Sequence, residues 1–196
     1  KTMINKYHSF LPALRAVKKD SLELQYVGKR MQGNITLVVT AVKKNGLTLQ
    51  YADKALQERN DIVLIAVTQN GMALQYAGNN CKENHNIVLA AVTQNGLALE
   101  FASPTLQQDP DIAWAAITQT TYAFASVHGD LKENFIFAQK VVNKPGFFLK
   151  FEDASLKKNP AIIQAAVTKH GETLQDAHEH FKDNYDIVYS AVTHYG

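Results

Sequence analysis

Hydrophobic and polar positions recur along this chain with a period of 25 residues. The segment DIVLIAVTQNGMALQYAGNN (61–80) is followed one period later by NIVLAAVTQNGLALEFASPT (86–105). The glycine of this pattern recurs at positions 46, 71, 96, 146, 171 and 196, while Ser21 and Thr121 occupy the two remaining places. Fixed self-similarity at such a period is typical of stacked repeat proteins.

The period predicts seven full units and a partial eighth. Counted from Leu11, the units are 11–35, 36–60, 61–85, 86–110, 111–135, 136–160 and 161–185, followed by 186–196. One unit cannot bury its apolar faces without neighbours, so we expect residues 1–196 to form one all-α, solenoid-like domain. The chain lacks a starting Met and stops on the glycine of the pattern, so we expect it to be a fragment of a longer protein.

The first half of each unit has the pattern of an amphipathic helix. Ile62, Val63, Ala66 and Val67 form two i,i+4 pairs that share one helical face. A preferred N-cap residue precedes this segment in six units, as Asn34, Asn84, Asp109, Asn134, Asn159 and Asn184. We expect Gly71 and its equivalents to end the helix in a left-handed conformation.

The second half of each unit allows two interpretations. Leu47, Leu49 and Tyr51 alternate as in a strand, so a leucine-rich repeat is the alternative fold. Leu49 and Leu56, however, lie seven residues apart, which places them on one helical face. We favour a second short helix, interrupted near Gly78 or Ser103, and therefore a helix hairpin in each unit.

The unit pattern D-I-V-L-A-A-V-x-Q-N-G-x-A-L-Q-Y-A-S-x-x-L-K-x-N resembles a repeat family known as domain of unknown function 4116, most clearly over residues 36–110. The resemblance implies a helical repeat module and supplies no catalytic motif and no cofactor. It also implies an effector-type protein that an intracellular bacterial pathogen delivers into its host. On this basis we expect a cytoplasmic protein, or one secreted into a host cell, whose partner is an unidentified protein.

Composition adds little beyond a globular chain. The sequence is 46% apolar and 19% charged, which is ordinary for a soluble domain. It contains no apolar run long enough to span a bilayer, and KTMINKYHSF at its start lacks the apolar region of a signal peptide. Cys81 stands alone at a position that otherwise holds Met, Leu or Phe, so we expect a buried side chain and no reactive thiol.

Charge is distributed unevenly along the chain. Residues 1–60 hold 11 Lys and Arg against 4 Asp and Glu, whereas residues 61–196 hold 9 against 14. Four lysines occupy equivalent positions in the first two units and are expected to align as a basic stripe: Lys18, Lys19, Lys43 and Lys44. A basic stripe attracts nucleic acid, anionic lipid or an acidic protein surface, whereas the alternative is that these lysines only complete helix C-termini.

Units five to seven depart from the pattern and supply the other candidate binding residues. Unit five introduces Trp114, and unit six introduces Phe147 and Phe148. Unit seven has Glu172 where Leu or Met is usual, and Asp176 where Tyr is usual. The two interpretations are sequence drift and a binding patch across these units.

The stretch ETLQDAHEHF (172–181) comes closest to a metal or acid–base site. Glu172, Asp176 and His180 step by four and would share one face of a helix. In the same helix His178 and His180 would lie about 200° apart and could not bind one ion. Known catalytic and phosphate-binding motifs do not occur elsewhere, so no catalytic residue, cofactor or metal is expected.

Glutamine also recurs at one position, as Gln25, Gln50, Gln75 and Gln175, and predicts a hydrogen-bonded ladder between units. Because no motif demands chemistry, the sequence favours a non-enzymatic protein-interaction scaffold. Binding of nucleic acid or anionic lipid through the basic stripe is the second interpretation. An enzyme built on the 172–180 cluster is the third.

Overall fold

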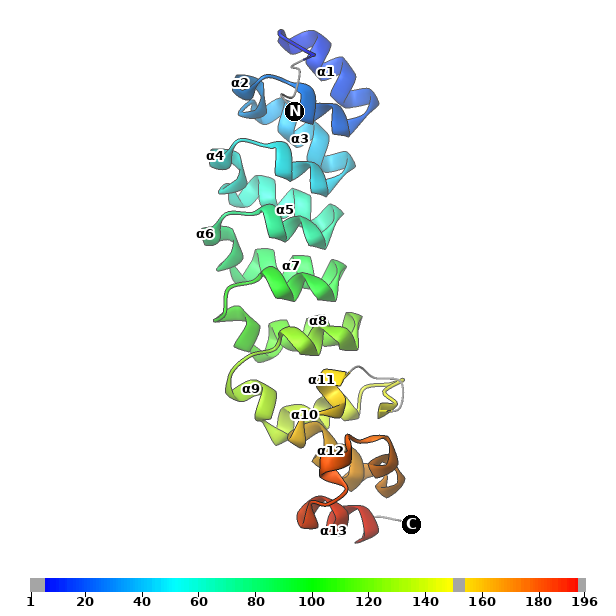
Figure 1. Ribbon diagram of the computed structural model, residues 1–196. Helices are drawn as coiled ribbons and strands as arrows, with labels where there is room; N and C mark the ends of the chain where they lie inside the picture. The colour runs from blue at the N-terminus through cyan, green and yellow to red at the C-terminus, as the bar shows by residue number, and fades with distance from the viewer. Residues whose placement is uncertain (1–5, 150–153, 194–196) are drawn as a thin grey trace.

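The protein is a stack of similar helical units (Figure 1). This structure, a computed structural model, describes residues 6–149 and 154–193. A typical unit contains a long helix, then a six-residue 3₁₀-helix, then a short helical turn. No β-strand occurs in the two described ranges, where an isolated bridge joins Tyr7 to Val27. The all-α repeat array is therefore confirmed, and the leucine-rich alternative is wrong.

The three kinds of element recur in register along the chain. The long helices are α1 (Phe10–Lys19), α3 (Ile35–Lys44), α5 (Asn60–Gln69), α7 (His85–Gln94), α8 (Pro110–Gln119), α10 (Phe135–Val142), α12 (Pro160–Lys169) and α13 (Tyr185–Thr193). The six-residue 3₁₀-helices are η1 (Ser21–Tyr26), η2 (Gly46–Tyr51), η3 (Gly71–Tyr76), η4 (Gly96–Phe101), η6 (Thr121–Ser126) and η8 (Gly171–Asp176). The short turns are α2 (Lys29–Gln32), α4 (Lys54–Gln57), α6 (Asn79–Lys82), η5 (Leu106–Gln108), α9 (Asp130–Glu133), α11 (Ala154–Lys157) and η9 (Glu179–Phe181).

The long helices form as their sequence predicts. The Asn84 side chain accepts hydrogen bonds from the backbone N–H groups of Asn86 and Ile87, at 3.1 and 3.3 Å, and so caps α7. The other five predicted caps also accept a backbone N–H bond in the first turn of their helix. The predicted apolar face of α5 is buried completely, which confirms the core positions of the unit.

The second half of each unit is not a single α-helix. Asn70 is extended, with φ −152° and ψ 110°, and its side chain accepts from the Met72 N–H to start η3. The 3₁₀-helix η3 then ends at Tyr76, and the short helix α6 begins at Asn79. The predicted interruption near Gly78 is therefore confirmed: the second half of the unit is helical and consists of a 3₁₀-helix followed by a separate short helix.

The glycine after Asn70 does not adopt a left-handed conformation. Among the described residues, only Gly129 and Gly146 have positive φ, so the predicted left-handed C-cap at Gly71 is wrong. Gly71 is required by a close approach instead. A Cβ atom there would lie 2.3 Å from the Ala91 carbonyl oxygen of the next unit, and Gly46 and Gly96 have equivalent contacts. We call this contact between successive units the glycine seam.

Glutamine side chains fasten the glycine seam. Gln69 accepts a hydrogen bond from the Gly46 N–H and donates one to the Lys44 carbonyl at 3.2 Å, so one amide bridges two units. Gln94 and Gln119 accept in the same way from Gly71 and Gly96. The ladder predicted at the other glutamine position is wrong, because those side chains stay within their own unit: Gln50 donates to Leu47 and Gln75 to Met72, each at 3.1 Å.

A second set of inter-unit bonds joins the short turns through the backbone. The N–H of Asp53 donates to the Gln32 carbonyl at 2.9 Å, and the N–H of Gly78 donates to the Gln57 carbonyl at the same distance. Equivalent bonds run from Ser103 to Lys82, from His128 to Gln107 and from His178 to Lys157. In the first units these bonds align the short turns α2, α4 and α6 along one edge of the stack (Figure 1).

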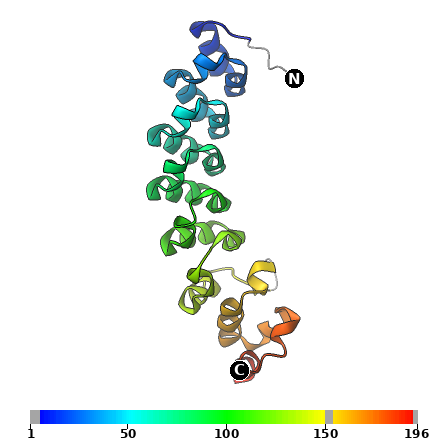
Figure 2. The same cartoon turned by 60° about the vertical axis from the view of Figure 1, so that its left-hand side comes forward.

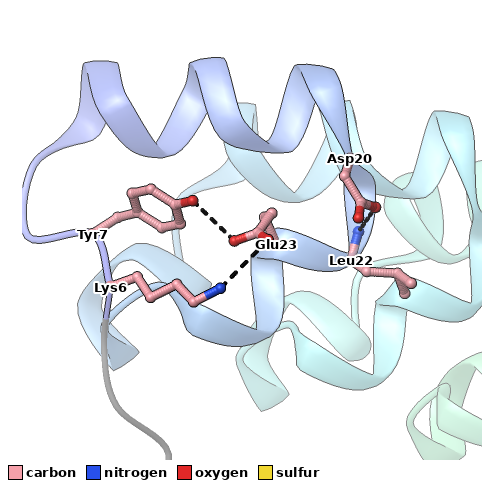
Figure 3. Close-up of polar contacts among 5 residues, drawn as sticks. All are labelled: Lys6, Tyr7, Asp20, Leu22 and Glu23. Atoms are coloured by element: carbon pink, nitrogen blue, oxygen red, sulfur yellow. Dashed lines mark hydrogen bonds and ion pairs between the residues drawn. The ribbon is translucent and has the colours of Figure 1, made fainter.

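The described N-terminal segment covers the first unit (Figure 3). The Lys6 N–H donates to the Tyr26 carbonyl at 2.9 Å, and the Lys6 ammonium lies 3.6 Å from a Glu23 carboxylate oxygen. The Tyr7 hydroxyl donates to Glu23 at 2.9 Å, and this bond raises the pKa of Tyr7. The Asp20 side chain accepts from the Leu22 N–H and caps η1 as Asn70 caps η3.

The stack changes direction after the fifth long helix. Units from α1 to α8 follow one line, and the units from α9 onward are displaced to one side of it (Figure 2). Gly129 begins this displaced part with φ 61° and ψ −156°, a conformation that is essentially restricted to glycine. The departures of units five to seven therefore coincide with a change in geometry.

We expect Gly71→Ala to destabilise the fold by about 1–3 kcal/mol, because its methyl group would overlap a backbone carbonyl that cannot swing away. Gly78→Ala is the matched control. Its Cβ would lie 1.9 Å from the Glu58 Cδ, but Glu58 is an exposed side chain that can rotate. Urea unfolding of both variants measures the difference, and equal losses of stability would refute the close-contact explanation.

Gln94→Ala should cost about 1–2 kcal/mol, because it removes the acceptor of the Gly71 N–H between two units. Gln75→Ala removes a bond within one unit and should cost less than about 1 kcal/mol. The free energies of unfolding of the two variants, measured side by side, test which glutamine position connects the units. A larger loss for Gln75→Ala would contradict the assignment.

Candidate functional site

One partly exposed apolar side chain per unit forms a row, whose first five members lie on 3₁₀-helices and whose sixth, Phe147, follows α10 outside any described helix. Its members hold the same position in six successive units: Leu22, Leu47, Met72, Leu97, Tyr122 and Phe147. Leu22, Leu97 and Tyr122 are 41%, 44% and 56% exposed, and the others are half-buried. The four 3₁₀-helices η1 to η4 pack in sequence, and η6 packs on η4. We call these six residues the apolar row.

The row exists because a 3₁₀-helix has three residues per turn. In η4, Gly96, Ala98 and Leu99 are buried against neighbouring elements, and this leaves Leu97 and Glu100 facing outward, three residues apart. A hollow of about 450 Å³ lies on this face between Leu97 and Tyr122. The outward side chains of successive units therefore frame a shared surface.

A larger pocket lies between units six and seven. This pocket has a volume of about 510 Å³ and is lined by residues 142–149 of unit six and by Ala166, Lys169, His170, Glu172, Thr173 and Asp176 of unit seven. Phe147, the sixth member of the row, and Glu172, at the corresponding position of the next unit, both line it. We call it the unit-six pocket.

Pro145 explains why the pocket opens in this unit. At the corresponding position of unit three, the Asn70 N–H donates to the Ala66 carbonyl and the Asn70 side chain caps the 3₁₀-helix. Proline has no N–H and no side-chain acceptor, so it performs neither task. Helix α10 consequently ends at Val142 and has 8 residues, whereas α5 has 10.

The close contact of the glycine seam is also absent between units six and seven. Gly146 corresponds to Gly71, yet a Cβ atom on Gly146 would meet nothing within 4 Å. Lys169 stands where Gln94 stands in unit four and offers no oxygen to a glycine N–H; its ammonium instead donates to the Val142 carbonyl at 3.1 Å. The backbone of unit six therefore does not make the close contact with Ala166 that the glycine seam makes elsewhere, and Ala166, although buried, lines the pocket.

Sequence comparison identifies the repeat. The family model described as a domain of unknown function, DUF4116, matches residues 13–57, 60–107 and 84–132. The chain belongs to the DUF4116 family. No curated protein and no solved structure matches it. The matched residues of the DUF4116 repeat include the first five members of the apolar row and end before the unit-six pocket.

The unit-six pocket brings together four of the residues singled out in the sequence. Phe147, Phe148, Glu172 and Asp176 all line it, and Phe148 is 63% exposed. Neither carboxylate has a hydrogen-bond or ion-pair partner within residues 6–149 and 154–193. Pro145 and Lys169 were not identified from the sequence: Pro145 replaces the Asn that starts the 3₁₀-helix within a unit, and Lys169 replaces the Gln that bonds to the preceding unit.

Trp114 and His180 lie elsewhere. Trp114 is on α8, where the Lys140 ammonium of α10 lies 4.4 Å from the centroid of its ring, and it does not line the pocket. His180 belongs to η9, beyond the end of η8 at Asp176, so the predicted shared face with Glu172 and Asp176 is wrong. The expectation assumed one α-helix, whereas Glu172 and Asp176 lie on the 3₁₀-helix η8, which ends before His180.

The two histidines also differ from the expectation for an α-helix. The Nδ1 atoms of His178 and His180 are 3.2 Å apart on an exposed turn, so the predicted separation of about 200° is wrong. Across the described part of the chain, no group of three or more His, Cys, Asp or Glu side chains is placed to hold a metal ion. The 172–180 stretch therefore does not form the convergent cluster that its spacing predicted.

The basic stripe lies at the C-terminal ends of α1 and α3. Lys18, Lys19, Lys43 and Lys44 are all exposed, and none has an ion-pair partner among the residues that the structure describes. The Lys44 ammonium donates to the Lys18 carbonyl and so occupies the place that Gln69 takes one unit later. One of the four lysines therefore has a structural role between units.

Cys81 is completely buried, as its repeat position predicted. Its thiol lies 3.2 Å from the Asn60 side-chain oxygen, and burial raises the pKa of Cys81 to about 11. A thiol with this pKa stays protonated near neutral pH and is a poor nucleophile.

In the ranges described, no helix is both long and apolar enough to cross a membrane.

Proposed function

We propose that this DUF4116 chain is a non-enzymatic protein-interaction scaffold and that the apolar row is its contact surface. The observation that carries the proposal is the row itself, which places one partly exposed apolar side chain on each of six successive units. Contiguous apolar surface of this kind marks interaction sites on soluble proteins.

The construction of the array supports this proposal. Stacked repeats present extended surfaces, and a partner segment that runs along the stack meets the same position of each unit in turn. The row varies in size from Leu and Met to Tyr and Phe, while the buried neighbours in η3 and η4 are small or aliphatic. Variation at outward positions adjusts specificity without disturbing the core.

The family resemblance supports a narrower form of the proposal. If the chain acts as part of an effector that a bacterial pathogen delivers into a host cell, the partner is a host protein. The scaffold proposal itself depends only on the surface and holds for either location.

A paired set of variants tests the contact surface. Leu97→Glu with Tyr122→Glu should reduce capture of a specific partner at least about tenfold, because charges replace the centre of the row. Leu64→Glu with Ile136→Glu is the control, since these residues are 41% and 75% exposed but lie on the long helices α5 and α10. Crosslinking in cells followed by quantitative mass spectrometry measures capture, and equal capture by both variants would refute the proposal.

Binding of nucleic acid or anionic lipid is the second candidate function. It is favoured by the basic stripe, where four exposed lysines lie at the ends of two stacked helices within residues 1–60, the part of the chain with excess positive charge. Neighbouring charges of one sign add their fields and attract polyanions in a salt-dependent way.

Charge reversal separates this candidate from the scaffold. Lys18, Lys19 and Lys43 are changed to Glu together, and Lys44 is kept because it bonds to the Lys18 carbonyl. The matched control reverses Lys29, Arg30 and Lys54, which are exposed in the same two units. Single-stranded RNA and phosphatidylserine vesicles should lose affinity only for the first variant, and the wild-type affinity should fall as salt rises. Equal binding by the two variants would rule out the stripe.

A further inference from the structure

The unit-six pocket carries two carboxylates at positions that are apolar or aromatic in most other units. Glu172 corresponds to members of the apolar row, such as Leu97, and Asp176 corresponds to aromatic residues, such as Tyr51 and Tyr76. Both replacements occur in one unit, and both side chains line the pocket. Random sequence drift does not explain why both acidic replacements line the same pocket, at an interface where the close glycine contact is absent.

Two lysines also line the pocket, so its preference for a cation rests on the two carboxylates being unpaired among the described residues and not on an excess of negative charge. Lys169 is already bonded to the Val142 carbonyl, so Lys144 is the one lining lysine without a described partner. Helices α10 and α12 both end at the pocket, through Val142 and Lys169. A helix C-terminus carries partial negative charge, which adds to that of the two carboxylates.

The pocket also has an aromatic wall and a suitable size. Phe147 is half-buried at its edge, and the face of an aromatic ring attracts a guanidinium or ammonium group. Its volume of about 510 Å³ falls within the range of small-ligand pockets, about 300–1,000 Å³. A single side chain of a protein partner fits this space together with part of its backbone.

We propose that the unit-six pocket binds the cationic side chain, arginine or lysine, of a protein segment that lies along the apolar row. This inference rests on the proposed scaffold function and names the partner's chemistry. Apolar side chains of the segment contact the row as far as Phe147, and its basic side chain then meets Glu172 and Asp176. The excess of acidic residues over 61–196, 14 against 9 basic ones, complements a basic partner.

Titration with small probes tests the pocket directly. N-acetyl-arginine amide is added to the isotope-labelled full chain, and backbone amide signals are followed by NMR. The signals of residues 142–149 and 166–176 should shift saturably, and the affinity should fall as salt rises. N-acetyl-glutamate amide and N-acetyl-leucine amide are the charge and apolar controls, and each should bind at least about tenfold more weakly.

A double variant uses the repeat as its own template. Glu172→Leu with Asp176→Tyr gives unit seven the residues that unit two has as Leu47 and Tyr51, so the fold should be kept. This variant should lose at least about tenfold in affinity for the arginine probe. Glu100→Gln with Asp111→Asn removes the same charge outside the pocket and should bind the probe as the wild type does.

The outcomes distinguish the pocket from the scaffold. Equal binding of the glutamate or leucine probe, or unchanged binding of arginine by the double variant, overturns the pocket inference. If capture of a partner depends on Leu97 and Tyr122 while the arginine probe fails to bind, only the pocket inference falls. If the double variant loses its native NMR spectrum, Glu172→Gln, which keeps the side-chain shape, gives the same comparison.

Discussion

The contact that governs this array is the approach of a glycine in one unit to the end of the long helix in the next. A side chain at Gly71 would overlap the Ala91 carbonyl, so the spacing of the units is set by backbone against backbone. Glutamine completes the contact because one amide group both accepts and donates, as Gln69 does between Gly46 and Lys44. Units joined by this contact pack their long helices against one another, and the buried residues of the described chain form one continuous apolar core.

The unit-six pocket shows the effect of releasing this contact. Proline at 145 shortens the helix, and lysine at 169 provides an ammonium group where an amide oxygen is needed. The two changes lie on opposite sides of the same interface, so either one alone would leave a partner group without its usual bond. Together they remove the requirement for close contact at Gly146 and leave space beside the row. Unit seven then resumes a long helix and a 3₁₀-helix, because stacked repeats depend only on their nearest neighbours.

The period, the N-caps and the buried face of the long helix could be predicted because each is written in local sequence, as Asn84 and Val63 illustrate. The roles of Gly71 and Gln94 could not, because both depend on atoms of another unit. The 3₁₀-helix was missed since Leu49 and Leu56 are buried in either helical form. For the site, departure from the repeat correctly drew attention to Phe147, Glu172 and Asp176. It could not separate them from Trp114 and His180, because a departure does not reveal the direction of a side chain.

The position of each residue in the 3₁₀-helix explains how structure and recognition coexist in so short a repeat. Gly96 faces the next unit and cannot change, whereas Leu97, its neighbour, faces outward and is constrained by no seam. A residue of the apolar row can therefore be substituted at little cost to stability. Successive units can in this way acquire side chains of different size along the same surface. A pocket is different, because it requires a seam to open and so gives up contacts between two units. Because each unit contacts only its neighbours, the lost contacts affect only the interface between units six and seven. A pocket at that interface can therefore provide specificity without destabilising the rest of the array.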